Sequence, residues 1–197
     1  MHAATRIALL FSCLPLMGQG PADDGRWHAG AYSYSDEMGG FRILSVSGAG
    51  TRDDPVSIVQ ELDSATPIVL TIRAERPMKT LGAGPEFASG MIYMRVSAVN
   101  GSGVPWIAYE FELQEKIGEP STFGDGLSFD QRRKEGSSEL GSDSFGHYSR
   151  DYEPYDRVRF TEGAIDPRAL GIFRLFITDF TPAPIFYLRQ DPQAPYS

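Results

Sequence analysis

The sequence contains a single cysteine, Cys13, which lies in the first apolar stretch of the chain. An intrachain disulfide needs two cysteines, and structural zinc sites are built from several Cys and His side chains. The chain has only three histidines, and they show no metal-ligand spacing. The sequence therefore excludes an intrachain disulfide and argues against structural zinc, so we expect the hydrophobic core alone to hold the fold.

Basic residues are in the minority, with 18 Lys and Arg against 26 Asp and Glu and a net charge of −8. Nucleic acids and anionic membranes attract proteins through basic patches, so this balance argues against both partners. Apolar runs are short as well, and none has the ~20 residues that a transmembrane helix needs. We therefore expect neither a nucleic-acid partner nor a membrane span.

Residues 1–22 show the three zones of a removable secretory signal. The first zone, residues 1–6, is short and carries Arg6 as its positive side chain. Residues 7–17 form an apolar run, and small, turn-prone residues follow up to Ala22. Cleavage after Ala22 leaves residues 23–197 as an exported protein, either periplasmic or extracellular. A lipoprotein anchored through Cys13 is the alternative, because the Leu-Phe-Ser-Cys segment resembles a bacterial lipobox.

After residue 22 the sequence shows almost no helical periodicity. Apolar and polar residues alternate instead, with a period of two. Side chains of a strand project alternately to opposite faces, so this alternation is typical of half-buried strands. The strand-like segments are residues 41–46, 56–62, 67–76, 91–99, 106–115, 157–161, 172–178 and 185–189. They predict an all-β fold, an antiparallel, jelly-roll-like β-sandwich of about eight or nine strands, with a closed barrel as the alternative.

The sequence indicates one domain, residues 23–197, since a chain of this length can bury a sufficient core. Periodicity fails from Ile117 to Tyr155, and we interpret 117–155 as a long loop or insertion. The Pro-rich, polar residues 190–197 are expected to form a flexible tail.

A candidate ligand surface follows from one turn. Residues 100–103, Asn-Gly-Ser-Gly, predict a hairpin between the strands that flank them. Pairing of those strands would bring Tyr93 and Arg95 next to Trp106 on the face opposite the core. An exposed patch of aromatic and charged side chains suits a carbohydrate or an envelope or extracellular protein as partner.

Signals for catalysis are weak, and no G-x-S-x-G motif occurs. Glu110 and Glu112 share a strand face at a spacing that glycosidase carboxyl pairs use. His147 lies among serines near Asp143 and could act as a base. Ordinary surface or loop side chains are a far more frequent explanation for each of these residues, so we assign no catalytic residue.

Calcium is the one cofactor that the sequence suggests. Asp125, Asp130 and Asp143 lie in Gly- and Ser-rich stretches, and calcium is bound by oxygen ligands in such turns. Their spacing matches no EF-hand loop, and solvated carboxylates are the alternative.

Taken together, these features favour an exported, non-catalytic binding or structural module. Two further hypotheses stay open: a hydrolase acting on polysaccharide or cell-envelope material, and a calcium-stabilised extracellular domain.

Overall fold

The computed structural model describes residues 20–80, 86–131, 136–151 and 155–195, and the side chains of all of these except Phe123 and Asp151. The expected leader falls mostly in residues 1–19, outside this part of the chain, and stays a prediction. Among the described residues no helix is long and apolar enough to cross a membrane.

Thirteen strands and one short 3-10 turn make up the described chain. They are β1 (Trp27–Ala29), β2 (Tyr32–Ser35), β3 (Phe41–Ser47), β4 (Val56–Leu62), β5 (Ile68–Ala74), β6 (Met91–Asn100), β7 (Ala108–Gln114), η1 (Phe123–Asp125), β8 (Leu127–Phe129), β9 (Gly141–Ser142), β10 (Phe145–Asp151), β11 (Arg157–Gly163), β12 (Leu170–Asp179) and β13 (Ile185–Gln193).

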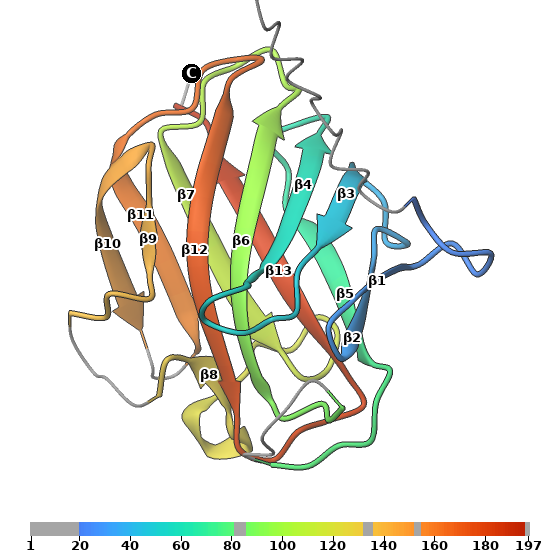
Figure 1. The fold of residues 1–197 in the computed structure, drawn as a ribbon. Helices are drawn as coiled ribbons and strands as arrows, with labels where there is room; N and C mark the ends of the chain where they lie inside the picture. Colours follow the sequence, from blue (N-terminus) through green and yellow to red (C-terminus); the bar gives the residue numbers. More distant parts are fainter. Residues whose placement is uncertain (1–19, 81–85, 132–135, 152–154, 196–197) are drawn as a thin grey trace, which may run out of the picture.

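The strands form two sheets that pack face to face (Figure 1). The seven-stranded sheet has the order β1-β2-β5-β13-β7-β11-β10, and the six-stranded sheet includes β3-β4-β6-β12-β8, with β9 paired to β12. Neighbours are antiparallel except β4 and β6, which run parallel. The predicted all-β sandwich is confirmed.

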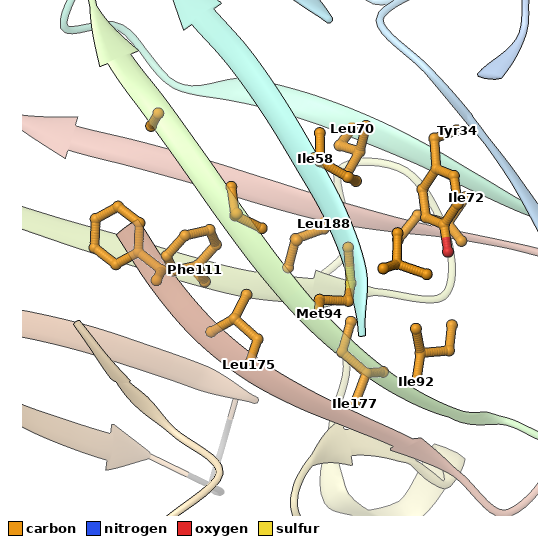
Figure 2. Packing of buried hydrophobic residues seen from close by; sticks show 14 of the residues in the cluster. Tyr34, Ile58, Leu70, Ile72, Ile92, Met94, Phe111, Leu175, Ile177 and Leu188 are labelled. Atoms are coloured by element: carbon orange, nitrogen blue, oxygen red, sulfur yellow. The ribbon is translucent and has the colours of Figure 1, made fainter. Parts of the chain in front are cut away.

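The core lies between the sheets, and strand alternation fills it as the sequence predicts. Figure 2 shows Ile58 and Met94 of the six-stranded sheet close to Leu70 and Leu188 of the seven-stranded sheet. All four side chains are at most 2% exposed. Full burial of such a side chain stabilises the fold by about 1.5–3 kcal/mol, which explains how a core without disulfides suffices.

Phe173 of β12 is the centre of an aromatic cluster. Its ring centroid lies 4.6 Å from Tyr109, 5.1 Å from both Phe111 and Phe160, and 6.0 Å from Phe145. These partners belong to the seven-stranded sheet, so the cluster joins the two layers.

A polar contact also crosses the core. The Gln60 amide of β4 donates to Gln190 Oε1 of β13 at 2.6 Å, and Tyr109 Oη donates to the same oxygen at 2.9 Å. The Gln190 amide donates back to Gln60 at 3.2 Å. Buried amides are unfavourable unless bonded, so this reciprocal pair favours one alignment of the sheets.

The predicted hairpin between 91–99 and 106–115 is wrong. β6 and β7 lie in different sheets, and the connection crosses from one layer to the other. Asn100 explains the crossing, because its amide donates to the carbonyls of Val104 and Ile165, both at 2.9 Å. Its carboxamide oxygen accepts from the Ser102 backbone N–H at 3.0 Å, so the Asn-Gly-Ser-Gly segment forms a turn whose two polar side chains are buried and whose glycines are exposed.

Three further expectations need correction. Segment 117–155 contains β8, β9 and β10 rather than one long irregular loop. These strands lack visible periodicity because two of them are only two or three residues long. The tail expected at 190–197 is in part strand, since β13 extends to Gln193 and Gln190 is fully buried. The short strands also raise the total above the eight or nine expected.

We predict that Phe173→Ala lowers the free energy of unfolding by about 3–5 kcal/mol, because it leaves a cavity among four rings. Urea unfolding followed by fluorescence measures the loss. Leu44→Ala is the control, since Leu44 is 47% exposed and its truncation should change the free energy by under about 0.5 kcal/mol. Equal effects of the two variants would contradict the central place of Phe173.

Candidate functional site

Two arginines face each other on the outer surface of the six-stranded sheet. In the antiparallel register of β6 and β12, Arg95 lies directly opposite Arg174. Both side chains are exposed. Like charges directly opposite each other destabilise a strand pair by a few tenths of a kcal/mol up to about 1 kcal/mol. The sheet therefore carries this pair at some loss of stability.

An aromatic pair occupies the next position on the same face. Tyr93 lies opposite Phe176, and their rings stack with centroids 4.1 Å apart and planes inclined by 18°. Phe176 is fully buried, whereas Tyr93 is partly exposed. Stacking on the buried Phe176 supports the Tyr93 ring, which lies one position along the same face from Arg95.

The loop between β3 and β4 forms one wall over this face (Figure 1). Its conformation is set by the Asp54 carbonyl, which accepts from the N–H groups of Ala49, Gly50 and Thr51 at 2.9–3.1 Å. The Gly50 carbonyl in turn accepts from the Tyr93 N–H at 3.1 Å, which fixes the loop to β6.

Arg52 projects from this loop and forms an ion pair with Glu139, from the segment before β9. The Arg52 side chain is 64% exposed and that of Glu139 only 16%. The pair joins two segments that are far apart in the sequence. It also neutralises Glu139, the one carboxylate at this place in the described part of the chain.

These residues enclose a pocket of about 270 Å³, which we call the arginine pocket and define by Arg52, Tyr93, Arg95, Glu139 and Arg174. Among the residues that the structure describes, three arginines and one glutamate line it. The chain as a whole carries a net charge of −8, so the excess of positive charge in this pocket is opposite in sign to the net charge of the molecule.

Gly141 of β9 leaves room for the Arg174 guanidinium. A Cβ atom at position 141 would lie 2.5 Å from Arg174 Nη2. A glycine at this position lets Arg174 lie against the backbone of β9, which orients the guanidinium within the pocket.

Of the three predicted ligand-binding residues, the structure brings Tyr93 and Arg95 together and separates Trp106 from them. Trp106 is fully buried, and its indole N–H donates to Ser102 Oγ at 3.1 Å. The prediction of an exposed Trp106 is wrong, because it assumed the hairpin that does not form.

Sequence reasoning missed Arg52, Glu139 and Arg174. Only Arg174 has a local signal, since it interrupts the apolar run Ile-Phe-Arg-Leu-Phe of β12. The other two come from irregular segments, and nothing in their neighbours indicates that they meet.

The predicted calcium ligands do not converge. Asp125 precedes Leu127, which pairs with Asp179, whereas Asp143 accepts from the Ile172 N–H at 2.8 Å, toward the other end of β12. Strand rise places these two carboxylates roughly 20 Å apart. Within the described ranges no group of three or more His, Cys, Asp or Glu side chains could hold a metal ion.

Each of the three carboxylates also has local donors. Asp125 accepts from the Thr122 and Leu127 N–H groups, both at 3.0 Å, as in a helix cap. Asp130 is buried and accepts from Ser137 Oγ. Asp143 accepts from Ser144 Oγ at 2.9 Å in addition to the Ile172 N–H. All three carboxylates therefore accept hydrogen bonds from donors of the protein itself.

Glu110 and Glu112 lie on the other sheet, on the outer face of β7. Glu112 is 2% exposed and accepts from Gln114 Nε2 at 2.7 Å and from Arg157 at 2.6 Å. Glu110 lies 3.7 Å from the same arginine, and burial raises its pKa above the ordinary value. The pair forms a charged network with Arg157 rather than two accessible carboxyl groups.

His147 does not complete a catalytic arrangement with these carboxylates. It pairs with Thr161 on β11, while Glu110 pairs with Arg159 on the far side of that strand. Two interstrand spacings of ~4.8 Å each therefore separate the two residues, before their offset along the strands is added.

Comparison of the chain with protein-family models, with curated proteins and with solved structures gave no match. The site must therefore be interpreted from its own geometry.

We predict that calcium leaves the stability unchanged. A ligand that binds only the folded state raises its melting temperature. Since the three aspartates are bonded to protein donors, melting temperatures in excess calcium and in excess chelator should agree within about 1 °C. A clear rise with calcium, lost in Asp125→Asn, would contradict this prediction.

We predict that Glu110→Gln becomes relatively more stable as the pH rises. The raised pKa of Glu110 means that its ionised form is less favourable in the folded than in the unfolded state, so the wild type loses stability as this group ionises. The variant's advantage in the free energy of unfolding should grow from about pH 4 to about pH 7.

Glu37→Gln provides the matched control of opposite sign. A hydrogen bond from Arg73 lowers the pKa of Glu37 below its ordinary value of 4.5. Its ionisation therefore stabilises the fold, and the variant should lose relative stability as the pH rises from about 3 to about 5 and change little above that. If the free energies of unfolding of both variants, relative to the wild type, changed in the same direction with pH, the opposite pKa shifts assigned to Glu110 and Glu37 would be contradicted.

Proposed function

We propose that this protein is an exported, non-catalytic binding module that holds an anionic group of its ligand in the arginine pocket. The facing pair Arg95 and Arg174 carries the proposal. Among the described residues neither arginine forms an ion pair, although both line one pocket. An anion between them would convert a repulsive contact into two attractive ones.

The chemistry of the pocket supports an oxyanion as ligand. A guanidinium presents its N–H groups as a planar fork that matches carboxylate, phosphate or sulfate oxygens. A hydrogen bond to a charged partner contributes about 1.5–3 kcal/mol. Carbohydrates that carry carboxylate or phosphate groups present such oxyanions, and they agree with the expected export.

The overall charge of the molecule adds selectivity. A net charge of −8 repels anions from the surface as a whole. Binding of an anion therefore depends on the local geometry of the pocket, and the loss of one arginine should have a large effect.

We predict that inorganic phosphate, titrated at constant ionic strength, binds saturably with a dissociation constant of about 1–10 mM. Arg95→Gln and Arg174→Gln should each weaken binding about tenfold, which corresponds to ~1.4 kcal/mol. Chemical shifts of the arginine Nε–H groups and of the Tyr93 amide measure the titration.

Arg159→Gln is the matched control, since it removes the same charge from the exposed face of β11 in the other sheet. It should change the affinity less than about twofold. Gly141→Ala tests positioning without a change of charge, because its Cβ would displace the Arg174 guanidinium. A response that is not saturable, or equal losses in Arg159→Gln and Arg95→Gln, would refute the proposal.

A further inference from the structure

We infer that the ligand is an amphiphilic anion, whose charged group binds in the arginine pocket and whose apolar part enters a second pocket beside it. This inference rests on the proposed function and extends it to the chemical class of the ligand.

The second pocket has a volume of about 240 Å³, and we call it the apolar pocket and define it by Tyr32, Phe87, Met91 and Ile92. Arg52 and Tyr93 line this pocket as well as the arginine pocket. The two pockets are therefore neighbours that share a wall, since β6 and the loop between β3 and β4 contribute residues to both.

Strand β6 runs under both pockets and changes character along its outer face. Met91, Tyr93 and Arg95 alternate on this face, with Met91 in the apolar pocket and Arg95 in the arginine pocket. Successive residues on one face of a strand are about 6.6 Å apart. Met91 and Arg95 are two such steps apart, so a ligand along β6 passes from an apolar to a cationic environment over roughly 13 Å.

The apolar pocket has little charge of its own. Tyr32 Oη accepts from the Gly90 N–H at 3.0 Å, and burial raises the pKa of Tyr32 to about 12, so the phenol stays neutral at physiological pH. Ile92 also lines this pocket, but it is only 1% exposed and belongs to the hydrophobic core. Arg52, at the boundary, is the one charged residue among the described residues that line it.

The size of the pockets agrees with one ligand that occupies both. Small-molecule sites have volumes of roughly 300–1,000 Å³, and each pocket alone falls below that range. The two together lie within it. The aliphatic part of the Arg52 side chain lies between them and can pack against a ligand that crosses the boundary.

The test compares inorganic phosphate, hexyl phosphate and 1-hexanol at constant ionic strength, with the wild-type protein and two variants. In the wild type, hexyl phosphate should bind about tenfold more tightly than phosphate, and hexanol should bind weakly. Met91→Ser should remove most of this gain and leave the affinity for phosphate unchanged.

Leu44→Ser is the control for non-specific binding of the hexyl chain, since Leu44 is 47% exposed and lines neither pocket. It should retain the tenfold gain. Equal affinities of the wild type for phosphate and hexyl phosphate would overturn the inference and leave the proposed function standing. Failure of both probes to bind would overturn the two together.

A last experiment distinguishes a soluble amphiphilic ligand from the surface of a lipid membrane. Vesicles that contain anionic phosphatidylglycerol should not sediment the protein more than neutral phosphatidylcholine vesicles do. Binding to anionic vesicles without binding of soluble hexyl phosphate would overturn the inference of a soluble amphiphile.

Discussion

The antiparallel register of β6 and β12 is the constraint on which the rest of the structure depends. Nine residue pairs align these strands, from Val99 with Leu170 to Met91 with Thr178. The register places Met94 and Leu175 in the core and brings Arg95 opposite Arg174 outside it. A slip of one residue would exchange the two faces. Core packing and the arginine pocket therefore follow from one alignment, and neither can change alone.

Strand alternation in the sequence predicts which side chains of β5, β6 and β7 face the core, because burial of one face imposes a period of two. It does not predict which strands are partners. The Asn-Gly-Ser-Gly turn has the composition of a hairpin, yet the bonds of Asn100 to Val104 and Ile165 direct the chain into the other sheet. Those bonds depend on contacts far apart in the sequence, which no local pattern records.

In the arginine pocket, too, some residues can be predicted from the sequence of one strand and others only from contacts between distant segments. Tyr93 and Arg95 follow from alternation along one strand, so the sequence suffices to place them on the face away from the core. Arg174 and Glu139 meet them only through sheet pairing and the ion pair with Arg52. Trp106 was placed wrongly because an aromatic residue at a strand end can point outward or fill the end of the core. Its bond to Ser102 decides between these outcomes.

The parallel pairing of β4 with β6 has a consequence for cooperativity. Parallel strands cannot be joined by a hairpin, and the chain between these two passes through β5 of the opposite sheet. The chain can therefore complete the six-stranded sheet only after β5 has crossed into the seven-stranded sheet. Neither sheet is an independent folding unit, and the described sandwich should unfold in a single transition without a stable half-molecule.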